Sequence, residues 1–241
     1  MRIPLRGTLL NVGLVVLGSV VGLTLGAGLL GDYRGVALSA LGLVTLAMGL
    51  QMFLKHQNVL VVAGAVSIGA VLGSVIGLQG GLVKLGESLQ QVSGGGGTFV
   101  EGFVGASVLF CVGPMTLMGC IQDGVEGRSE LLDLKSVLDG VASVFLAATL
   151  GVGVLFSAVS VLVVQGLLTL FGRRLQGLRD DAWVLGDLTG AGGIMMMGIG
   201  LGLLQIKSLP MANFLPALAL VPLMIGGSRW FAARRSSPVS A

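Results

Sequence analysis

The sequence predicts an all-α protein, a polytopic transmembrane bundle of about eight helices, and three observations support this fold class. Seven uncharged runs are each long enough for a helix of about 20 residues to cross ~30 Å of hydrocarbon. Of 241 residues, 54% are hydrophobic and only 10% are charged, too few to cover a water-soluble surface. Basic residues gather on one side of the resulting map. The runs are 7–31, 35–54, 57–83, 102–122, 140–172, 188–206 and 208–228.

The run 140–172 is too long for a single crossing. Its 33 uncharged residues would form a helix of ~50 Å. The segment Gly151–Gly153 is a natural break, and the apolar stretch Leu131–Leu138 extends the first arm backwards. We therefore expect two helices, 133–150 and 153–172, joined at the glycines.

The basic residues orient the eight helices. With a cytoplasmic N-terminus, eleven basic residues lie inside and three lie outside, as the positive-inside rule requires. Seven helices would place the C-terminal arginines outside. We expect both termini in the cytoplasm, one transmembrane domain over 1–233 and a disordered tail over 234–241. The inner set is Arg2, Arg6, Lys55, Arg128, Lys135, Arg173, Arg174, Arg179, Arg229, Arg234 and Arg235, and the outer set is Arg34, Lys84 and Lys207.

Two segments admit alternatives. Arg2 and Arg6 before an apolar run also fit a secretory signal, although the run to Gly31 is long for one. The outer segment 79–98 has apolar residues at helical spacing, which predicts a helix lying along the outer interface. The alternative for this segment is an ordinary surface loop.

Glycines at four-residue spacing predict close helix contacts. Such small-xxx-small ladders pack within the monomer or across a homodimer, and we expect at least one to serve the monomer. Four identities at a constant offset also indicate an inverted repeat of helices 1–3 and 6–8, as in many secondary transporters, or a chance match. The ladders are Gly18, Gly22, Gly26 and Gly69, Gly73, Gly77; the repeat pairs Ala40, Gly42, Gly49, Leu50 with Ala191, Gly193, Gly200, Leu201.

The segment 113–124 is the least ordinary part of the chain. Pro114 removes a backbone donor near the middle of the fourth helix, and broken backbone at that depth needs protein or a water-filled cavity around it. Asp123 ends this helix, and Asp139 lies inside the fifth. An ionised aspartate at a helix centre costs ~2.5–3.5 kcal/mol on insertion scales, so it is a functional candidate. Alternatively, both lie near the inner interface, where water or Lys135 satisfies them.

Polar residues around these aspartates are candidates for binding a small solute or cation. Ser136 and Ser143 flank Asp139 on one helix face. Gln165 and Asn213 are amides in apolar runs, where each needs a partner. The sequence offers Asp139 no evident buried basic partner, which favours cation or proton coupling. The full candidate set is Asp139, Asp123, Gln122, Thr116, Pro114, Gly113, Ser136, Ser143, Gln165 and Asn213.

These motifs resemble a known family, the bacterial membrane proteins of Domain of Unknown Function 554. The resemblance spans essentially the whole chain and implies a bacterial inner-membrane protein without assigning an activity. Cys120 departs from the small polar or alanine residue associated with its position, which argues against an essential thiol. The matching residues are Gly113-Pro114-Met115-Thr116, Gly119, Ile121-Gln122-Asp123-Gly124, Lys135-Ser136, Leu138-Asp139-Gly140, Gln165-Gly166 and Asn213-Phe214-Leu215-Pro216.

A transporter or channel for a small solute or cation is the favoured function, with a non-transport sensor, scaffold or assembly factor as the alternative. An enzyme is not expected, because intramembrane aspartyl proteases need Gly-x-Gly-Asp and 184–187 reads Val-Leu-Gly-Asp. We expect no cofactor or metal, since no His, Cys or carboxylate cluster completes a site. The expected partners are the lipid bilayer, a small solute or cation, and a second copy through the glycine ladders; nucleic acid is not expected.

Overall fold

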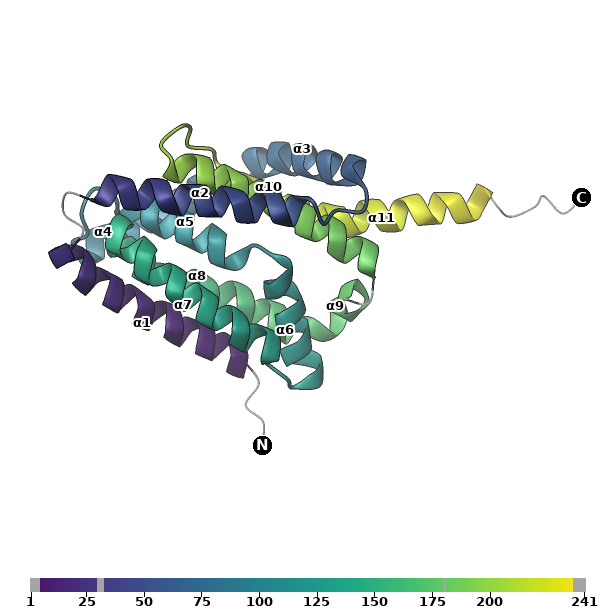
Figure 1. Cartoon of the computed structure of the whole chain (residues 1–241). Helices are drawn as coiled ribbons and strands as arrows, with labels where there is room; N and C mark the ends of the chain where they lie inside the picture. Colours follow the sequence, from purple (N-terminus) through teal and green to yellow (C-terminus); the bar gives the residue numbers. More distant parts are fainter. Residues whose placement is uncertain (1–4, 30–32, 180, 236–241) are drawn as a thin grey trace, which may run out of the picture.

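The computed structural model describes residues 5–29, 33–179 and 181–235, which form helices and no strand (Figure 1). The helices are α1 Arg6–Leu29, α2 Arg34–Phe53, α3 Val59–Ile76, α4 Leu78–Ser93, α5 Phe99–Cys111, α6 Pro114–Glu126, α7 Glu130–Leu150, α8 Gly153–Leu170, α9 Gly172–Arg179, α10 Ala182–Leu203, the 3-10 helix η1 Met211–Phe214 and α11 Pro216–Arg235. The α11 helix includes residues 234 and 235 of the predicted tail, and 236–241 lie outside the described residues.

Six segments of the described chain are long and apolar enough to cross a membrane: α1, α2, α3, α8, α10 and the segment Met211–Arg229. The pair α5 and α6, bent by 60°, adds a seventh if it forms one span. The α7 helix has 21 residues but carries four charged ones, so its composition alone does not qualify it. The predicted all-α polytopic fold is confirmed.

The predicted hairpin at the glycines is present. The α7 helix ends at Leu150, and α8 begins at Gly153. Between them Gly151 has φ +83°, a conformation that L side chains rarely adopt. The predicted start of the first arm at residue 133 was too late, because α7 begins at Glu130.

Two predicted single helices are divided in the structure. The run 57–83 splits into α3 and α4 at Gly77, whose φ of +77° ends α3 with a left-handed residue. The run 102–122 splits into α5 and α6 at Val112 and Gly113, hereafter the break. Gly113 has φ +134°, and Pro114 follows as the first residue of α6, a position at which its missing N–H costs no helical bond.

The predicted helix in the outer segment is confirmed as α4. Gly86 lies against α5, since a Cβ there would sit 3.0 Å from the Phe103 ring. The opposite side is open, with Leu85 47% and Val92 91% exposed. This half-buried helix joins α3 to α5.

The first glycine ladder packs α1 against α7 (Figure 1). A Cβ at Gly18 would lie 2.1 Å from the Gly140 carbonyl oxygen, and one at Gly22 would lie 2.2 Å from that of Val144. Residue numbers rise together along this contact, so the helices run parallel. Gly26 continues the row one turn further on.

The second ladder packs α3 against η1 and α11. A Cβ at Gly69 would lie 2.6 Å from the Ala217 nitrogen, and one at Gly73 would lie 2.0 Å from the Asn213 oxygen. Both ladders therefore pack helices together within the monomer, as we expected for at least one of them. A homodimer remains a prediction, and the ladder glycines other than Gly77 already face neighbouring helices of the same chain.

The α2 and α10 helices meet through four glycines that contact each other reciprocally (Figure 1). A Cβ at Gly42 would lie 3.1 Å from the Gly200 oxygen, and one at Gly200 would lie 3.0 Å from the Gly42 oxygen. Gly49 and Gly193 repeat the arrangement at 2.8 and 2.5 Å. Along this contact the residue numbers of α2 rise while those of α10 fall, so these helices are antiparallel.

The apolar core has two parts that share α10. One cluster includes Phe110, Val112 and Met195, and joins α10 to α1, α5, α7, α8 and η1. The other joins α10 to α3 and α11, and includes Val62 and Val221. The α10 helix also lies against the break, and this contact positions the site described next.

Candidate functional site

Asp139 lies in a buried cluster, here called the polar core, formed by Asn11, Lys135, Asp139 and the carbonyl group of Phe110. The Lys135 ammonium group pairs with Asp139 and donates to the Phe110 oxygen at 2.8 Å. The Asn11 amide donates to the same Asp139 oxygen at 2.9 Å. Asn11 is 0%, Lys135 6% and Asp139 9% exposed, so α1, α5 and α7 meet at a solvent-excluded ion pair.

The break explains why Lys135 is bound here. In a continuous helix the Phe110 carbonyl would accept from the amide of residue 114, but Pro114 has no N–H. The Lys135 ammonium group supplies the missing donor, and the Thr116 hydroxyl donates to the same oxygen at 3.4 Å. The proline therefore creates an acceptor inside the bundle that a buried cation satisfies.

The expectation that Asp139 has no buried basic partner is wrong. Lys135 precedes it by four residues, so both side chains share one face of α7. Lys135 therefore belongs to the bundle interior and not to the inner surface charges. The pairing lowers the cost of each charge in lipid, so burial of Asp139 alone no longer argues for cation binding.

Ser136 and Ser143 flank Asp139 on α7 as predicted, and both are fully buried. Their hydroxyls donate to their own helix, Ser136 to the Leu132 oxygen at 2.5 Å and Ser143 to the Asp139 oxygen at 2.7 Å. Such back-bonding leaves them no free donor for a ligand. Their role here is to line the α1–α7 contact.

Asp123 and Gln122 lie at the far end of α6 and bind the first turns of other helices. An Asp123 oxygen accepts from the Gly7 amide of α1 at 3.2 Å, and the Gln122 oxygen accepts from the Leu131 amide of α7 at 3.4 Å. Helix N-termini favour such acceptors because their first amides lack partners. Both residues are buried, and they fix where α1 and α7 begin.

Asn213 lies away from the polar core, in η1. Its oxygen accepts from the Gln79 amide at 2.8 Å, and its side-chain nitrogen donates to the Ser74 hydroxyl at 3.1 Å. Gln79 returns a bond, accepting from the Ala212 amide at 3.1 Å. These bonds hold the α3–α4 corner against η1, so Asn213 has a structural partner here.

Gln165 on α8 is fully buried, and neither atom of its amide group has a partner among the described residues. One turn along α8, the Thr169 hydroxyl lies 3.4 Å from that of Thr8 on α1. Asn11 is one turn beyond Thr8, so Gln165 and Asn11 occupy the same level of the antiparallel α1–α8 contact. The Asn11 oxygen also lacks a partner. Buried amides with unused groups mark a place where water or a polar solute fits.

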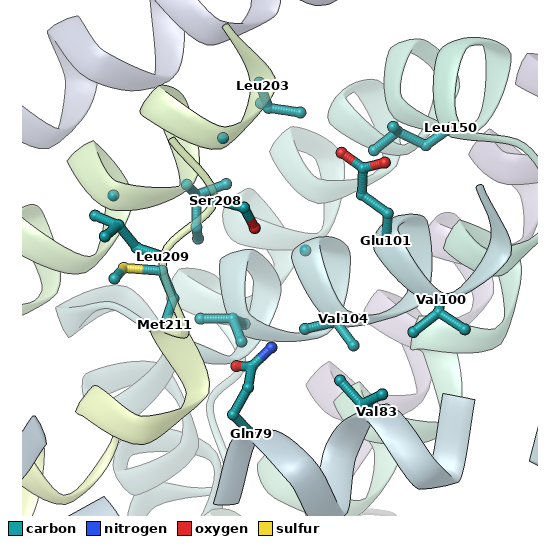
Figure 2. A pocket seen from close by; sticks show the side chains of 15 residues that line it. Gln79, Val83, Val100, Glu101, Val104, Leu150, Leu203, Ser208, Leu209 and Met211 are labelled. Atoms are coloured by element: carbon teal, nitrogen blue, oxygen red, sulfur yellow. The ribbon is translucent and has the colours of Figure 1, made fainter. Parts of the chain in front are cut away.

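A cavity of about 450 Å³ is lined by Gln79, Glu101 and Ser208 among others (Figure 2). It is here called the outer cavity because the sequence predicts that these segments lie on the outer side. Figure 2 shows the Glu101 carboxylate and the Gln79 amide group directed towards its interior. On α5 it extends from Val100 to Val108, two residues before Phe110. The remaining lining residues are Val83, Val104, Gly105, Leu150, Gly198, Ile199, Gly202, Leu203, Ser208, Leu209 and Met211.

A second cavity of about 660 Å³, here called the inner cavity, is lined by Gly113 of the break and by Leu188 of α10, whereas the α10 residues of the outer cavity lie between Gly198 and Leu203. Val112, 4% exposed, and Met195, 0% exposed, are packed in the core. The sequence also predicts that Pro114 and Pro216 face a shared interior near the membrane midplane. The Pro114 side chain is outside the described residues, so this stays a prediction. The inner cavity is lined by Cys111, Gly113, Leu117, Leu168, Arg174, Leu188, Leu215, Leu218, Ala219, Pro222 and Leu223.

Within the described ranges, no three His, Cys, Asp or Glu side chains group as a metal site, and Cys111 and Cys120 are free thiols. Sequence reasoning missed one buried carboxylate, Asp187. One of its oxygens accepts from the Gln57 and Asn58 amides at 2.7 and 2.8 Å, at the start of α3. Like Asn11, it acts across more than a hundred residues of sequence, and no local pattern signals that.

Comparison with known proteins agrees with the predicted family. The family model described as "Protein of unknown function (DUF554)" matches residues 6–226. The chain is 27% identical to the uncharacterized membrane protein YdfK of Bacillus subtilis (strain 168), over 91% of this chain and 95% of that protein. It is 29% identical to the uncharacterized protein YqgA of Escherichia coli (strain K12), over 94% and 99%. No solved structure matches. The chain belongs to the DUF554 family of membrane proteins.

Proposed function

We propose that this protein is an inner-membrane transporter or channel for a small solute or cation, in which the Lys135–Asp139 pair controls passage. One observation carries the proposal. Polar groups, all buried except the half-buried Ser160, form a file between α1, α5, α6, α7 and α8, from beside the outer cavity to the Asp123 end of α6. Hydrogen bonds join Ser107 to Ser160, Asp139 to Lys135 and Asn11, and Thr8 to Thr169, and the other members are Gln165 and Asp123.

The file has features that a static bundle does not need. Polar side chains in lipid are costly, and they are usually retained where a solute or ion passes. Gln165 keeps both its donor and its acceptor unused. Glu101 at the outer cavity would attract cations towards this file. The Lys135 ammonium group already balances the charge of the Asp139 carboxylate. A proton or cation that binds Asp139 must therefore displace the Lys135 ammonium group.

Eight crossings with both termini in the cytoplasm are part of this proposal. The α1–α7 contact is parallel, and so is the α5–α8 contact, where Ser107 bonds Ser160 and Gly153 meets Phe99. The α2–α10 and α3–α11 contacts are antiparallel. Alternating crossings, with α5 and α6 as one span and α7 as the next, produce each of these directions.

The reciprocal glycines support the inverted repeat. The offset of 151 residues that pairs Gly42 with Gly193 also pairs Gly49 with Gly200. In the Gly42–Gly200 contact, this offset replaces Gly42 by Gly193 and Gly200 by Gly49, which gives the Gly49–Gly193 contact. A two-fold axis between α2 and α10 would relate the two contacts in the same way. The same offset relates α1 to α8 and α3 to α11, and each of these pairs is also in contact. Transporters with inverted repeats place their sites near such axes.

The alternative is a non-transport sensor, scaffold or assembly factor. One observation favours it: Lys135, Asp139, Asn11 and the Phe110 carbonyl satisfy one another, as they would in a purely structural ion pair.

Replacing Gln165 by Leu separates the two functions. The amide group has no partner to lose, so Gln165→Leu should keep or raise the thermal stability of the purified protein. In proteoliposomes loaded with a pH-sensitive dye and given a K⁺ or Na⁺ gradient, wild type should show flux, and Gln165→Leu should reduce it at least about tenfold.

Gln51→Leu, an amide replacement on the exposed face of α2, is the matched control and should leave flux unchanged. Glu101→Gln should slow cation entry without abolishing it. Absence of flux in wild type, or equal flux in Gln165→Leu, would move the assignment to the scaffold class.

A further inference from the structure

The inner cavity has a composition unlike that of the polar file. Its walls come from α5, α6, α8, α10 and α11 and are apolar, with Leu117, Leu168, Leu188 and Leu218 among them. Its volume of about 660 Å³ falls within the ~300–1,000 Å³ of pockets that bury most of a small ligand. Among the described residues that line it, Arg174 is the one with a charged side chain.

Arg174 is a cation without an internal counter-charge. Among the described arginine side chains, Arg6, Arg128 and Arg229 each pair with a carboxylate within 4 Å. Arg174 has no such partner within the described part of the chain. Its guanidinium carbon lies 5.8 Å from the centroid of the Phe171 ring, which holds the charge at the α8–α9 corner.

The position of Arg174 matches the headgroup level of a membrane. It lies on the short helix α9, whose sequence Gly172–Arg179 carries three arginines, between the ends of two spans. The distribution of basic residues places this corner on the cytoplasmic side. Basic pockets between transmembrane helices at that surface bind acidic lipid headgroups.

We propose that the inner cavity binds an acidic membrane phospholipid, with its phosphate on Arg174 and an acyl chain among the leucines of α6, α8, α10 and α11. A small polar anion would leave the apolar walls unfilled, and a neutral lipid would leave Arg174 unpaired. Cys111 and Gly113 are among the residues that line the cavity, so the bound chain contacts the break. The lipid thereby stabilises the broken helix that forms the polar core.

The test compares thermal unfolding of the full-length protein in detergent with added phosphatidylglycerol or phosphatidylcholine of equal chain length. Wild type should gain several degrees more from phosphatidylglycerol, and Arg174→Gln should lose that difference. Arg128→Gln, which removes an exposed arginine elsewhere, should retain it. An equal response of wild type to both lipids, or a preference that survives Arg174→Gln, would contradict the proposal.

Filling the cavity tests the acyl chain separately. Leu218→Trp should reduce by one the number of phosphatidylglycerol molecules retained in native mass spectrometry. Leu170→Trp, at a residue 64% exposed on α8, should not change that number. Unchanged retention in Leu218→Trp would place the lipid elsewhere. Equal stabilisation of wild type by a free fatty acid would show that the phosphate is not recognised, and would reject a phospholipid as the occupant.

Discussion

Lys135 and Asp139 depend on each other at the residue scale because both are excluded from water. Each charge alone would be costly in the bundle, while together with Asn11 and the Phe110 carbonyl they leave little charge unsatisfied. This mutual dependence changes what a substitution at Asp139 means. A loss of function in Asp139→Asn alone would have two explanations: a buried Lys135 left without its counter-charge, or the loss of a coupling site.

Asp139→Asn should therefore destabilise the protein strongly, by about 3–5 kcal/mol, because it leaves the buried Lys135 ammonium group without its counter-charge. The double variant Lys135→Gln with Asp139→Asn should recover most of that loss. Thermal unfolding of both variants in detergent measures the difference. If the single variant is as stable as wild type, Lys135 is not buried against Asp139.

A different ion pair joins Asp181, which precedes the α10 span, to Arg229, the last residue of the segment Met211–Arg229. The hydrogen bond from Arg229 holds the pKa of the Asp181 carboxyl below its ordinary value of 3.8. A carboxyl whose folded-state pKa is depressed adds stability above its unfolded value and loses it as the pH falls through the folded value.

Asp181→Asn should thus lower the melting temperature slightly at about pH 6, and by less at about pH 3, below the ordinary pKa of 3.8. Asparagine keeps the side-chain oxygen that accepts from the Trp183 and Val184 amides, so the helix cap survives and only the charge is removed. Melting curves at both pH values test this. A deficit that persists at the acid end would assign the effect to the cap.

At the element scale, glycine rows decide which helices approach each other. Gly18 and Gly22 bring α1 into backbone contact with α7, and this contact lets Asn11 reach Asp139. The break in α5–α6 supplies the remaining partner from a third element. The polar core is therefore a product of helix packing, and loosening α1 from α7 should disturb it.

Gly22→Ala should destabilise the protein by about 1–3 kcal/mol, because its Cβ would lie 2.2 Å from the Val144 oxygen and force the helices apart. Gly13→Ala on the same helix meets nothing within 4 Å and should be neutral or stabilising, since alanine favours helix. Thermal unfolding of the two variants provides the comparison. Equal stability would show that α1 does not contact α7 through this row.

At the scale of the whole molecule, the directions of the parallel and antiparallel helix contacts fit a bundle of eight crossings. The number of crossings depends on α7. This helix has too many charged residues to qualify as a membrane span by composition, although it packs alongside α1. The hairpin at Gly151 returns the chain as α8. Without this return, every later loop would change sides.

Topology reporters fused after Gly127 and after Gly177 should both report the cytoplasm, because the proposed topology has two crossings, α7 and α8, between these sites. The arginines of α9 favour the same side. Alkaline phosphatase and green fluorescent protein fusions give opposite signals on the two sides and so check each other. A periplasmic signal at Gly177 alone would merge α7 and α8 into one crossing.

The sequence by itself determined the membrane environment, the broken helix at Pro114, the hairpin at Gly151 and the family. These follow from local patterns: uncharged runs match the bilayer thickness, and proline or glycine breaks a helix wherever it stands. The sequence also places Lys135 four residues before Asp139. This spacing indicates an ion pair on one helix face and argues against the expectation of an unpaired carboxylate.

Only the tertiary structure decided which candidate residues meet. Lys135, which pairs with Asp139, and Thr116 both donate to the Phe110 carbonyl, whereas Asn213 lies at a distant corner. Asn11 reaches Asp139 across 128 residues of sequence. In lipid every apolar face is equally acceptable to the solvent, so hydropathy cannot say which helices are neighbours. Close backbone approach and hydrogen bonds between helices decide that, and both exist only once the bundle is assembled.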